Sequence, residues 1–255
     1  MIFALREFEY WMTHYRRTWR GTIVIGVVNP LLFLVAVGVG IGGLVHPNDP
    51  ALGGVPYLDF FAPGMLAAAA MQNGVVESAF PVARARSSSG SYRVAVSTPL
   101  EPDDILLGHA MFMAFKIAIG AAAFLVVLLA FGAARSTLVL LDLPAATLTG
   151  LAFALPVSAW AVTRREMSGI AGIFKWVVMP LYLFSGTFFA IGQLPAWVRP
   201  LAWLTPSWHG VELCRSLSLG TVTGSGAVIH VGYLLAVIGL GFVLARRAYR
   251  RHLHS

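Results

Sequence analysis

Long apolar stretches, separated by short polar segments, are the feature that most constrains this chain. One of them, residues 21–45, reads GTIVIGVVNPLLFLVAVGVGIGGLV and contains no charged residue. A helix needs about 20 apolar residues to cross the core of a bilayer. Only 11% of the 255 residues are charged and 58% are hydrophobic, whereas about a quarter of the residues of soluble domains are charged. We therefore predict an all-α integral membrane protein.

The apolar stretches predict six transmembrane helices in a single domain, residues 1–255. They lie at about residues 21–45, 57–80, 105–131, 138–162, 167–191 and 227–245. Neither a second domain nor a convincing internal repeat is seen. The single cysteine, Cys214, excludes an intrachain disulfide and a CxxC metal site.

Residues 1–20 predict an amphipathic helix. Apolar residues recur at steps of three or four and form one stripe, which consists of Met1, Leu5, Phe8, Met12, Tyr15 and Trp19. The rest of the surface is rich in arginine, and a basic amphipathic helix with aromatic residues at its edge tends to lie among lipid headgroups. We expect an interfacial helix on the cytoplasmic side. Packing against the protein itself is a compatible alternative.

The basic residues are distributed unequally between the two sides of the predicted bundle. Thirteen arginines lie in the N-terminal helix, the polar segment 81–104, the link Thr163–Glu166 and the C-terminal tail, and three lie on the other side. Loops rich in arginine and lysine remain in the cytoplasm. This bias predicts a multi-pass membrane protein with both termini in the cytoplasm.

Prolines and tryptophans gather in Leu194–Gly210, LPAWVRPLAWLTPSWHG. Tryptophan suits the depth of the headgroups, and proline suits the first turn of a helix. We predict short helices, one starting near Pro195 and one running from about Pro206 to Leu219, that form an outer re-entrant cap over residues 192–220. An ordinary aromatic loop is the alternative. The candidate residues of the cap are Pro195, Trp197, Trp203, Pro206, Trp208 and His209.

Several segments resemble the ABC-2 type permeases, the membrane subunits of ABC exporters. Tyr182–Gly220, YLFSGTFFAIGQLPAWVRPLAWLTPSWHGVELCRSLSLG, resembles the signature region of that family. Tyr92–Gly108, YRVAVSTPLEPDDILLG, is similar to the cytoplasmic loop that contacts the ATPase. Trp19–Gly42 and Phe60–Gln72 look like the nodulation-type branch, whose founding members export lipo-oligosaccharides. Daunorubicin-type drug exporters are close relatives.

The resemblance implies a permease subunit in the bacterial inner (plasma) membrane that moves an amphipathic substrate outward, such as a lipid-linked saccharide, a lipid or a drug. The implied partners are a dimer of P-loop ATPase subunits, which would bind ATP and Mg²⁺, a second and identical permease subunit, and membrane lipids. The chain has no GxxxxGK[ST] loop of its own. We therefore expect no enzymatic activity, no bound cofactor and no nucleic-acid partner for this chain.

The same resemblance makes residues 81–104 the ATPase-coupling loop. Relatives often carry both acidic and basic residues here, whereas ARARSSSGSYR has no acid, so the docking surface is expected to be unusually basic. The candidate coupling residues are Arg84, Arg86, Tyr92, Arg93, Thr98 and Pro99.

Three ionisable residues, Glu77, Lys116 and Lys175, lie inside the apolar stretches. Such groups are costly in a membrane and usually face protein or water. They are predicted to line the inner half of the pathway, where they suit a phosphate or sugar headgroup. The alternatives are snorkelling to the inner interface and a structural Glu–Lys pair.

Two other classes of function stay open at this stage. A secondary transporter or channel would favour paired broken helices, but only one interrupted region is seen. An intramembrane hydrolase would need Ser185 or Ser207 beside His209, without an evident acidic partner. The histidines His109, His209 and His230 have no metal-ligand spacing, so no metal site and no catalytic residue are predicted.

Overall fold

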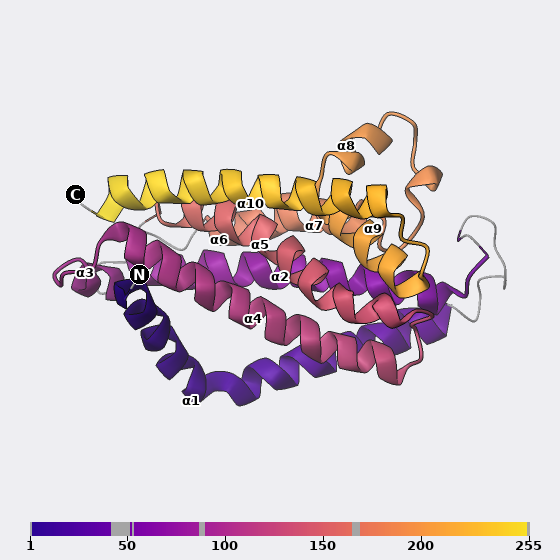
Figure 1. Ribbon diagram of the computed structural model, residues 1–255, viewed down its shortest axis with the longest axis horizontal. Coiled ribbons are helices and arrows are strands. Elements are labelled where there is room, and N and C mark those ends of the chain that lie inside the picture. The colour runs from indigo at the N-terminus through magenta and orange to yellow at the C-terminus, as the bar shows by residue number, and fades with distance from the viewer. Residues whose placement is uncertain (1, 42–51, 53, 87–89, 165–168, 254–255) are drawn as a thin grey trace.

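The computed structural model describes residues 2–41, 52, 54–86, 90–164 and 169–253, and the regular structure of these residues is entirely helical. The longer helices are α1 (Ile2–Phe33), α2 (Tyr57–Arg86), α4 (Pro102–Ala130), α5 (Asp142–Ala161), α9 (Pro206–Leu219) and α10 (Gly224–Leu253). The shorter ones are η1 (Leu34–Ile41), α3 (Ser91–Ala95), η3 (Thr137–Leu141), α6 (Ile170–Ile173), η4 (Phe174–Val178), α7 (Met179–Leu183), η5 (Ile191–Gln193) and α8 (Arg199–Trp203). Most of the long helices run along one axis (Figure 1).

Three helices in the described part of the chain are long and apolar enough to cross a membrane: Pro102–Ala130, Thr137–Ala161 and Gly224–Leu253. Phe174–Leu183 is a shorter apolar helix. Helix α2 is less apolar because Asp59, Gln72, Asn73 and Glu77 interrupt it. The predicted all-helical class is confirmed for these residues, and the count of six spans remains a prediction.

Helix α2 is the centre of the bundle and packs against α4, α5 and α9. Its closest approach is to α5, where a Cβ atom built on Gly74 would lie 2.2 Å from the carbonyl oxygen of Gly150. Small residues allow the backbones of two membrane helices to come this close. The two glycines therefore determine how α2 and α5 pack.

Several helices begin or end at residues other than those predicted from the sequence. Helix α2 continues past Phe80 to Arg86 although Pro81 removes one backbone N–H donor from the helix. The side chains of Val82, Ala83 and Ala85, which follow Pro81, are buried against neighbouring helices, and this packing offsets the lost hydrogen bond. Helix α4 begins at Pro102, since proline suits the first turn.

The predicted fifth span, residues 167–191, ends early, at Leu183, and its helix passes without interruption from α6 through the π-helical segment η4 into α7. Gly186 adopts a φ of 83°, which favours glycine and redirects the chain. Parts of four predicted segments lie outside the described residues: 42–45 of the first span, 87–89 of the coupling loop, 165–166 of the link and 167–168 of the fifth span.

The predicted interfacial helix and the start of the first span form one bent helix, α1 (Figure 1). Its N-terminal part packs on α4, with Ala4, Glu7 and Tyr15 buried. Leu5 and Trp19 of the predicted stripe are exposed, so the packed face is rotated from the one expected. The helix packs against its own protein, and its contact with lipid headgroups remains a prediction.

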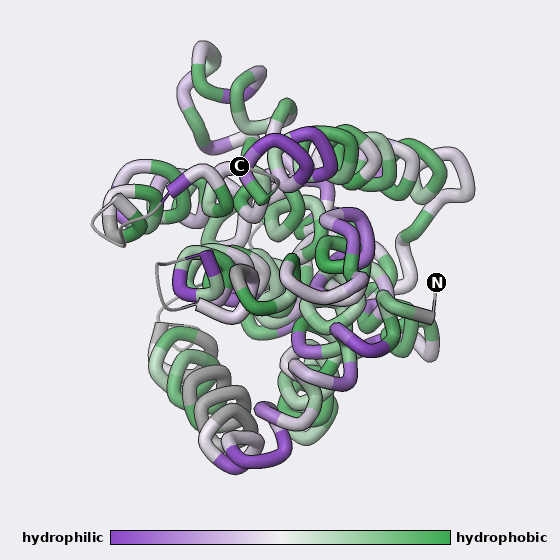
Figure 2. Tube along the Cα trace, turned by 90° about the vertical axis from the view of Figure 1, so that its left-hand side faces the viewer, coloured by the Kyte–Doolittle hydropathy of each residue, from purple (hydrophilic) through white to green (hydrophobic). Residues whose placement is uncertain are grey.

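Both ends of the described chain and α3 lie at one end of the bundle, which we call the termini end (Figure 1). The connections α4–η3 and α9–α10 lie at the far end, where Arg135 N–H donates to the carbonyl of Ser218. Viewed along the bundle, hydrophobic residues dominate the helices (Figure 2). The arrangement places the two termini on the same side, and the assignment of that side to the cytoplasm remains a prediction.

We expect Gly74→Ala to lower the free energy of unfolding by about 2 kcal/mol, because the new methyl group would overlap the α5 backbone. Gly232→Ala is the matched control, since a Cβ there meets open space and alanine favours a helix. Thermal unfolding of the purified variants measures both. Equal stability of the two variants would contradict the close α2–α5 packing.

Candidate functional site

A buried tyrosine connects three helices at the termini end. Tyr92, in α3, is fully buried, and its Oη lies 2.5 Å from Nδ1 of His109 in α4. The same oxygen lies 3.3 Å from Oη of Tyr249 in α10. Burial raises the pKa of Tyr92 well above its usual value, and the neighbouring Tyr249 raises it further. The phenol therefore keeps its proton at neutral pH and can donate it in a hydrogen bond.

Helix α1 joins this group through Trp11. The Trp11 ring stacks on His109 with ring centroids 4.3 Å apart and planes 11° from parallel. Trp11 Nε1 donates to Oε1 of the buried Glu7 at 2.8 Å. Burial raises the pKa of Glu7, and the bond from Trp11 opposes that shift. We call Glu7, Trp11, Tyr92, His109 and Tyr249 the Tyr92 cluster.

Ion pairs between α4 and α10 lie beside this cluster. Asp103 Oδ2 is 2.8 Å from Nη2 of Arg246 and 2.5 Å from Nη2 of Arg250. All three side chains are partly or largely exposed, so each pair contributes little to stability. They nevertheless join the same two helices that Tyr92 connects.

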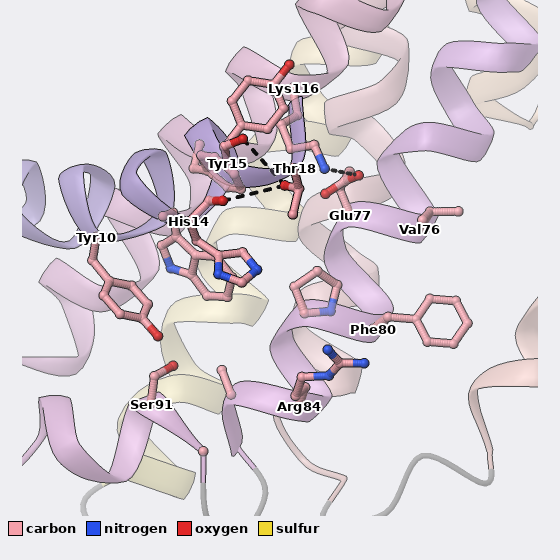
Figure 3. Close-up of a pocket in the computed structure, with 15 residues that line it drawn as sticks. Tyr10, His14, Tyr15, Thr18, Val76, Glu77, Phe80, Arg84, Ser91 and Lys116 are labelled. Atoms are coloured by element: carbon pink, nitrogen blue, oxygen red, sulfur yellow. Dashed lines mark hydrogen bonds and ion pairs between the residues drawn. The ribbon is translucent and has the colours of Figure 1, made fainter. Parts of the chain in front are cut away.

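A pocket of about 560 Å³ lies between α1, α2 and α4 and extends to α3 (Figure 3). Binding sites for small molecules commonly have volumes of ~300–1,000 Å³. The Glu77–Lys116 ion pair lies on one wall, with Lys116 Nζ 2.5 Å from Oε1 of Glu77. Tyr15 and Phe112 place their rings 5.7 and 5.9 Å from the ammonium group. The pocket therefore combines a charged pair with aromatic walls.

The structure brings together two of the three predicted intramembrane charges. The Lys116 and Glu77 side chains are 14% and 16% exposed, and both line the pocket. Lys175 lies apart on η4, where it is exposed and sits 5.2 Å from the ring of Trp176. The Glu–Lys pair expected as a structural alternative is present, and it also faces the cavity. A role for any of these residues in transport remains a prediction.

Some candidate coupling residues are buried inside the bundle, and others lie on its surface. Tyr92 points inward, whereas the neighbouring Val94 is 68% exposed. Thr98 and Pro99 form an exposed turn, in which Thr98 Oγ1 donates to the carbonyl of Ala95 at 2.6 Å. Arg84 and Arg86 lie on α2 rather than in a loop, and Arg84 lines the pocket. The side chain of Arg93 lies outside the described part of the structure.

The predicted cap, residues 192–220, contains helix α8 of 5 residues and helix α9 of 14 residues, and it begins at the end of the 3-10 helix η5. Helix α9 begins at Pro206 and ends at Leu219 as expected, with Thr205 Oγ1 accepting from Trp208 N–H. The first helix begins at Arg199 rather than near Pro195, because a turn with a bond from Val198 N–H to the Pro195 carbonyl comes first.

The aromatic residues of the cap differ in exposure. Trp197 is 76% exposed and Trp203 is half-exposed. His209 is buried, stacks on Tyr233 of α10 and lies 2.9 Å from His230 between Nδ1 atoms. Insertion of this region into a membrane remains a prediction.

The serines of the hydrolase alternative have other partners. Ser185 Oγ donates to the carbonyl of Tyr182, and Ser207 Oγ donates to Thr205 Oγ1. Neither of these bonds involves His209, so the described contacts do not assemble a nucleophile and base.

Sequence analysis missed the buried arginine of α9. Arg215 Nη2 donates to the carbonyl of Gly186 at 2.7 Å, and Nε donates to the carbonyl of Phe60 at 3.1 Å. Its guanidinium carbon lies 3.7 Å from the centroid of the Phe60 ring. Arg215 therefore connects α9 to α2 and to the turn after α7. Arg215 and its partner Glu212, 3.4 Å away, are the only charged residues in the sequence between Pro200 and Ala245, and this was the available signal.

Comparison with known proteins identifies the family. The family model of the ABC-2 type transporter matches residues 6–219. The chain belongs to the ABC-2 type transporter family. It is thus a multi-pass membrane protein and a transport component rather than an enzyme.

Curated relatives support the nodulation-type branch of this family. Nodulation protein J of Rhizobium leguminosarum bv. trifolii is 31% identical over 95% of this chain and 94% of the relative. The protein of the same name from R. leguminosarum bv. viciae is 27% identical over 95% of each chain. That of Rhizobium meliloti strain 1021 is 28% identical over 95% of this chain and 94% of the relative. The predicted family and branch are confirmed.

We expect Tyr92→Phe to lower the free energy of unfolding by about 1–2 kcal/mol, because it leaves the buried Nδ1 of His109 without the Tyr92 hydroxyl. Tyr10→Phe is the control, since that phenol is exposed. Chemical or thermal unfolding in detergent reports the difference. A Tyr92→Phe variant as stable as Tyr10→Phe would show that the bond contributes nothing.

Proposed function

We propose that this chain is the permease subunit of an ABC exporter that moves an amphipathic substrate outward. The substrate would be a lipid-linked saccharide, a lipid or a drug. A separate P-loop ATPase subunit would bind ATP and Mg²⁺ and hydrolyse the ATP, and two identical permeases would assemble with two ATPases. Membership of the ABC-2 family and the absence of a GxxxxGK[ST] loop from the sequence support transport by this chain and ATP hydrolysis by a separate subunit.

The observation that carries the proposal is the position of Tyr92. Helix α3 presents Val94 outward and buries Tyr92 against α4 and α10. When ATP closes the ATPase dimer, contact with the outer face of α3 would displace Tyr92. Because Tyr92 bonds to His109 and approaches Tyr249, that displacement would act on two helices that are long and apolar enough to cross the membrane. Trp11 would pass the same motion to α1.

This mechanism requires the termini end to face the cytoplasm of a bacterium. The arginine bias between the two sides supports that orientation. With six spans, the α8–α9 region would then lie at the outer side and form the re-entrant cap. The exposed Trp197 and the half-exposed Trp203 suit the outer headgroup layer.

Co-purification with the P-loop ATPase encoded beside this chain tests the proposal. We expect a stable complex that hydrolyses ATP in lipid and is stimulated by one class of amphiphile. Tyr92→Phe should keep the complex and its basal hydrolysis but reduce stimulation about 5- to 20-fold, because the link from α3 to α4 is weakened.

Tyr57→Phe serves as the matched variant, because it removes a phenol hydroxyl at the start of α2, where Tyr57 Oη donates to the carbonyl of Phe188, and it should be stimulated as the unmodified chain is. A permease that is intact but associates with no ATPase would overturn the proposal in favour of an independent transporter or channel.

A further inference from the structure

Helix α10 lies along one edge of the bundle and leaves a long face uncovered (Figure 1). In its most apolar stretch only 11% of the residues are buried, compared with 44% and 56% in the other two described helices that are long and apolar enough to cross a membrane. The exposed apolar side chains of α10 include Ile229, Leu240, Val243 and Leu244. Leu240 lies 11 residues after Ile229 and three and four residues before the other two, so all four share one side of the helix. We call these four residues the apolar row.

The same side of α10 becomes cationic at the termini end. Arg247 and Arg251 lie three and seven residues beyond the last member of the apolar row, so they continue it. Both arginines are exposed, and within the described part of the chain neither has an ion pair, a hydrogen bond or an aromatic ring as a partner. The neighbouring Arg246 and Arg250 are bound by Asp103. Arg247 and Arg251 therefore supply the positive charge of this side.

A change from hydrocarbon to positive charge along one side of a helix matches the structure of an anionic phospholipid. Arg247 lies about 4.5 Å beyond Leu244 along the helix axis, at ~1.5 Å per residue, so the cations begin where the apolar row ends. Arg247 and Arg251 are four residues apart, and side chains with this spacing have Cβ atoms ~5–6 Å apart. Two long guanidinium side chains at that separation can bind the oxygens of one phosphate.

We propose that Arg247 and Arg251 bind the headgroup of an anionic phospholipid, whose hydrocarbon chains lie along the apolar row of α10. Basic residues beside the end of a transmembrane helix attract anionic headgroups. The site distinguishes phosphatidylglycerol from phosphatidylcholine, because the choline group of the second lipid cancels the charge of its phosphate. The inference does not rest on the proposed export function, since it needs only that α10 crosses a membrane.

A protein partner fits this side of α10 less well than a lipid does. The sequence of α10 contains no acidic residue. A second copy, related by a two-fold axis along the membrane normal, would therefore bring four arginines together without a carboxylate from this helix. A water-soluble partner such as an ATPase subunit could reach the arginines, but it could not cover the apolar row that continues into the membrane. An anionic phospholipid satisfies both parts.

A lipid bound here would act on the part of α10 that joins the Tyr92 cluster. Tyr249 lies between the two arginines in sequence, but it is fully buried, with its Oη 3.3 Å from that of Tyr92. A ligand that binds only the folded state stabilises that state. The lipid would therefore help to fix the position of α10 at the cluster.

Native mass spectrometry of the purified permease, with dioleoyl phosphatidylglycerol or phosphatidylcholine added to the detergent, measures the Kd of each bound lipid. We expect the first phosphatidylglycerol to bind the unmodified chain about tenfold more tightly than phosphatidylcholine does. Arg247→Gln with Arg251→Gln should remove this preference. Arg246→Gln with Arg250→Gln changes the net charge equally at the same end of α10 and should retain the preference, because Asp103 already binds those two side chains.

Two further measurements separate a lipid site from a damaged fold and from a simple anion site. Arg247→Lys with Arg251→Lys keeps both charges, so the preference should stay within about threefold of that of the unmodified chain. Glycerol 1-phosphate carries the headgroup anion without hydrocarbon chains and should compete at least about 100-fold less well than the lipid.

Four results would overturn the proposal. They are equal affinity of the unmodified chain for the two lipids, an equal loss of preference in both double glutamine variants, equal competition by glycerol 1-phosphate, and a change in the number of bound chain copies in place of bound lipid. The assay contains no ATPase, so its failure is distinguishable from failure to form the exporter complex.

Discussion

The architecture depends on polar side chains that bond across the boundaries between helices. Tyr92 connects α3 to α4 and lies against α10, Arg215 connects α9 to α2, and the Glu77–Lys116 pair connects α2 to α4. A buried polar group without a partner is costly, and breaking such a pair destabilises a protein more than the pair itself stabilises it. Each of these contacts therefore constrains the relative position of two helices in a way that apolar packing does not.

These polar contacts lie at opposite ends of the bundle and join different sets of helices. Near the far end, Arg215 holds the α9 helix and the Gly186 turn against α2. At the termini end, the Tyr92 cluster and the Asp103 ion pairs join α1, α3, α4 and α10. The pocket lies beside this second group. A force applied to α3 would thus reach several long helices and the pocket wall together.

The order of apolar, polar and proline residues along the sequence predicted much of this architecture. Hydropathy and proline positions indicated the helical class, the start of α2 at Tyr57 and the extent of α9 from Pro206 to Leu219. These features depend on residues that are close in sequence. The rotated face of α1 escaped prediction because Glu7, a charged residue, is buried beside Trp11. Such burial depends on the partner helix rather than on periodicity.

The contacts between helices could not be predicted for the same reason. Glu77 and Lys116 are 39 residues apart, and Tyr92 and Tyr249 are 157 apart. The sequence indicated that Glu77, Lys116 and Lys175 were unusual and left a Glu–Lys pair open, but it did not indicate which lysine pairs with Glu77. The continuation of α2 through Pro81 likewise depends on tertiary packing.

Photo-crosslinking from α3 tests most directly the claim that a separate ATPase drives this permease through that helix. A photoreactive phenylalanine analogue would replace Val94, which is exposed at the termini end, and Thr137 at the far end would serve as the control. The account predicts a covalent adduct with the ATPase subunit from position 94 and none from position 137. An adduct from position 137, or none from position 94 in an assembled complex, would contradict it.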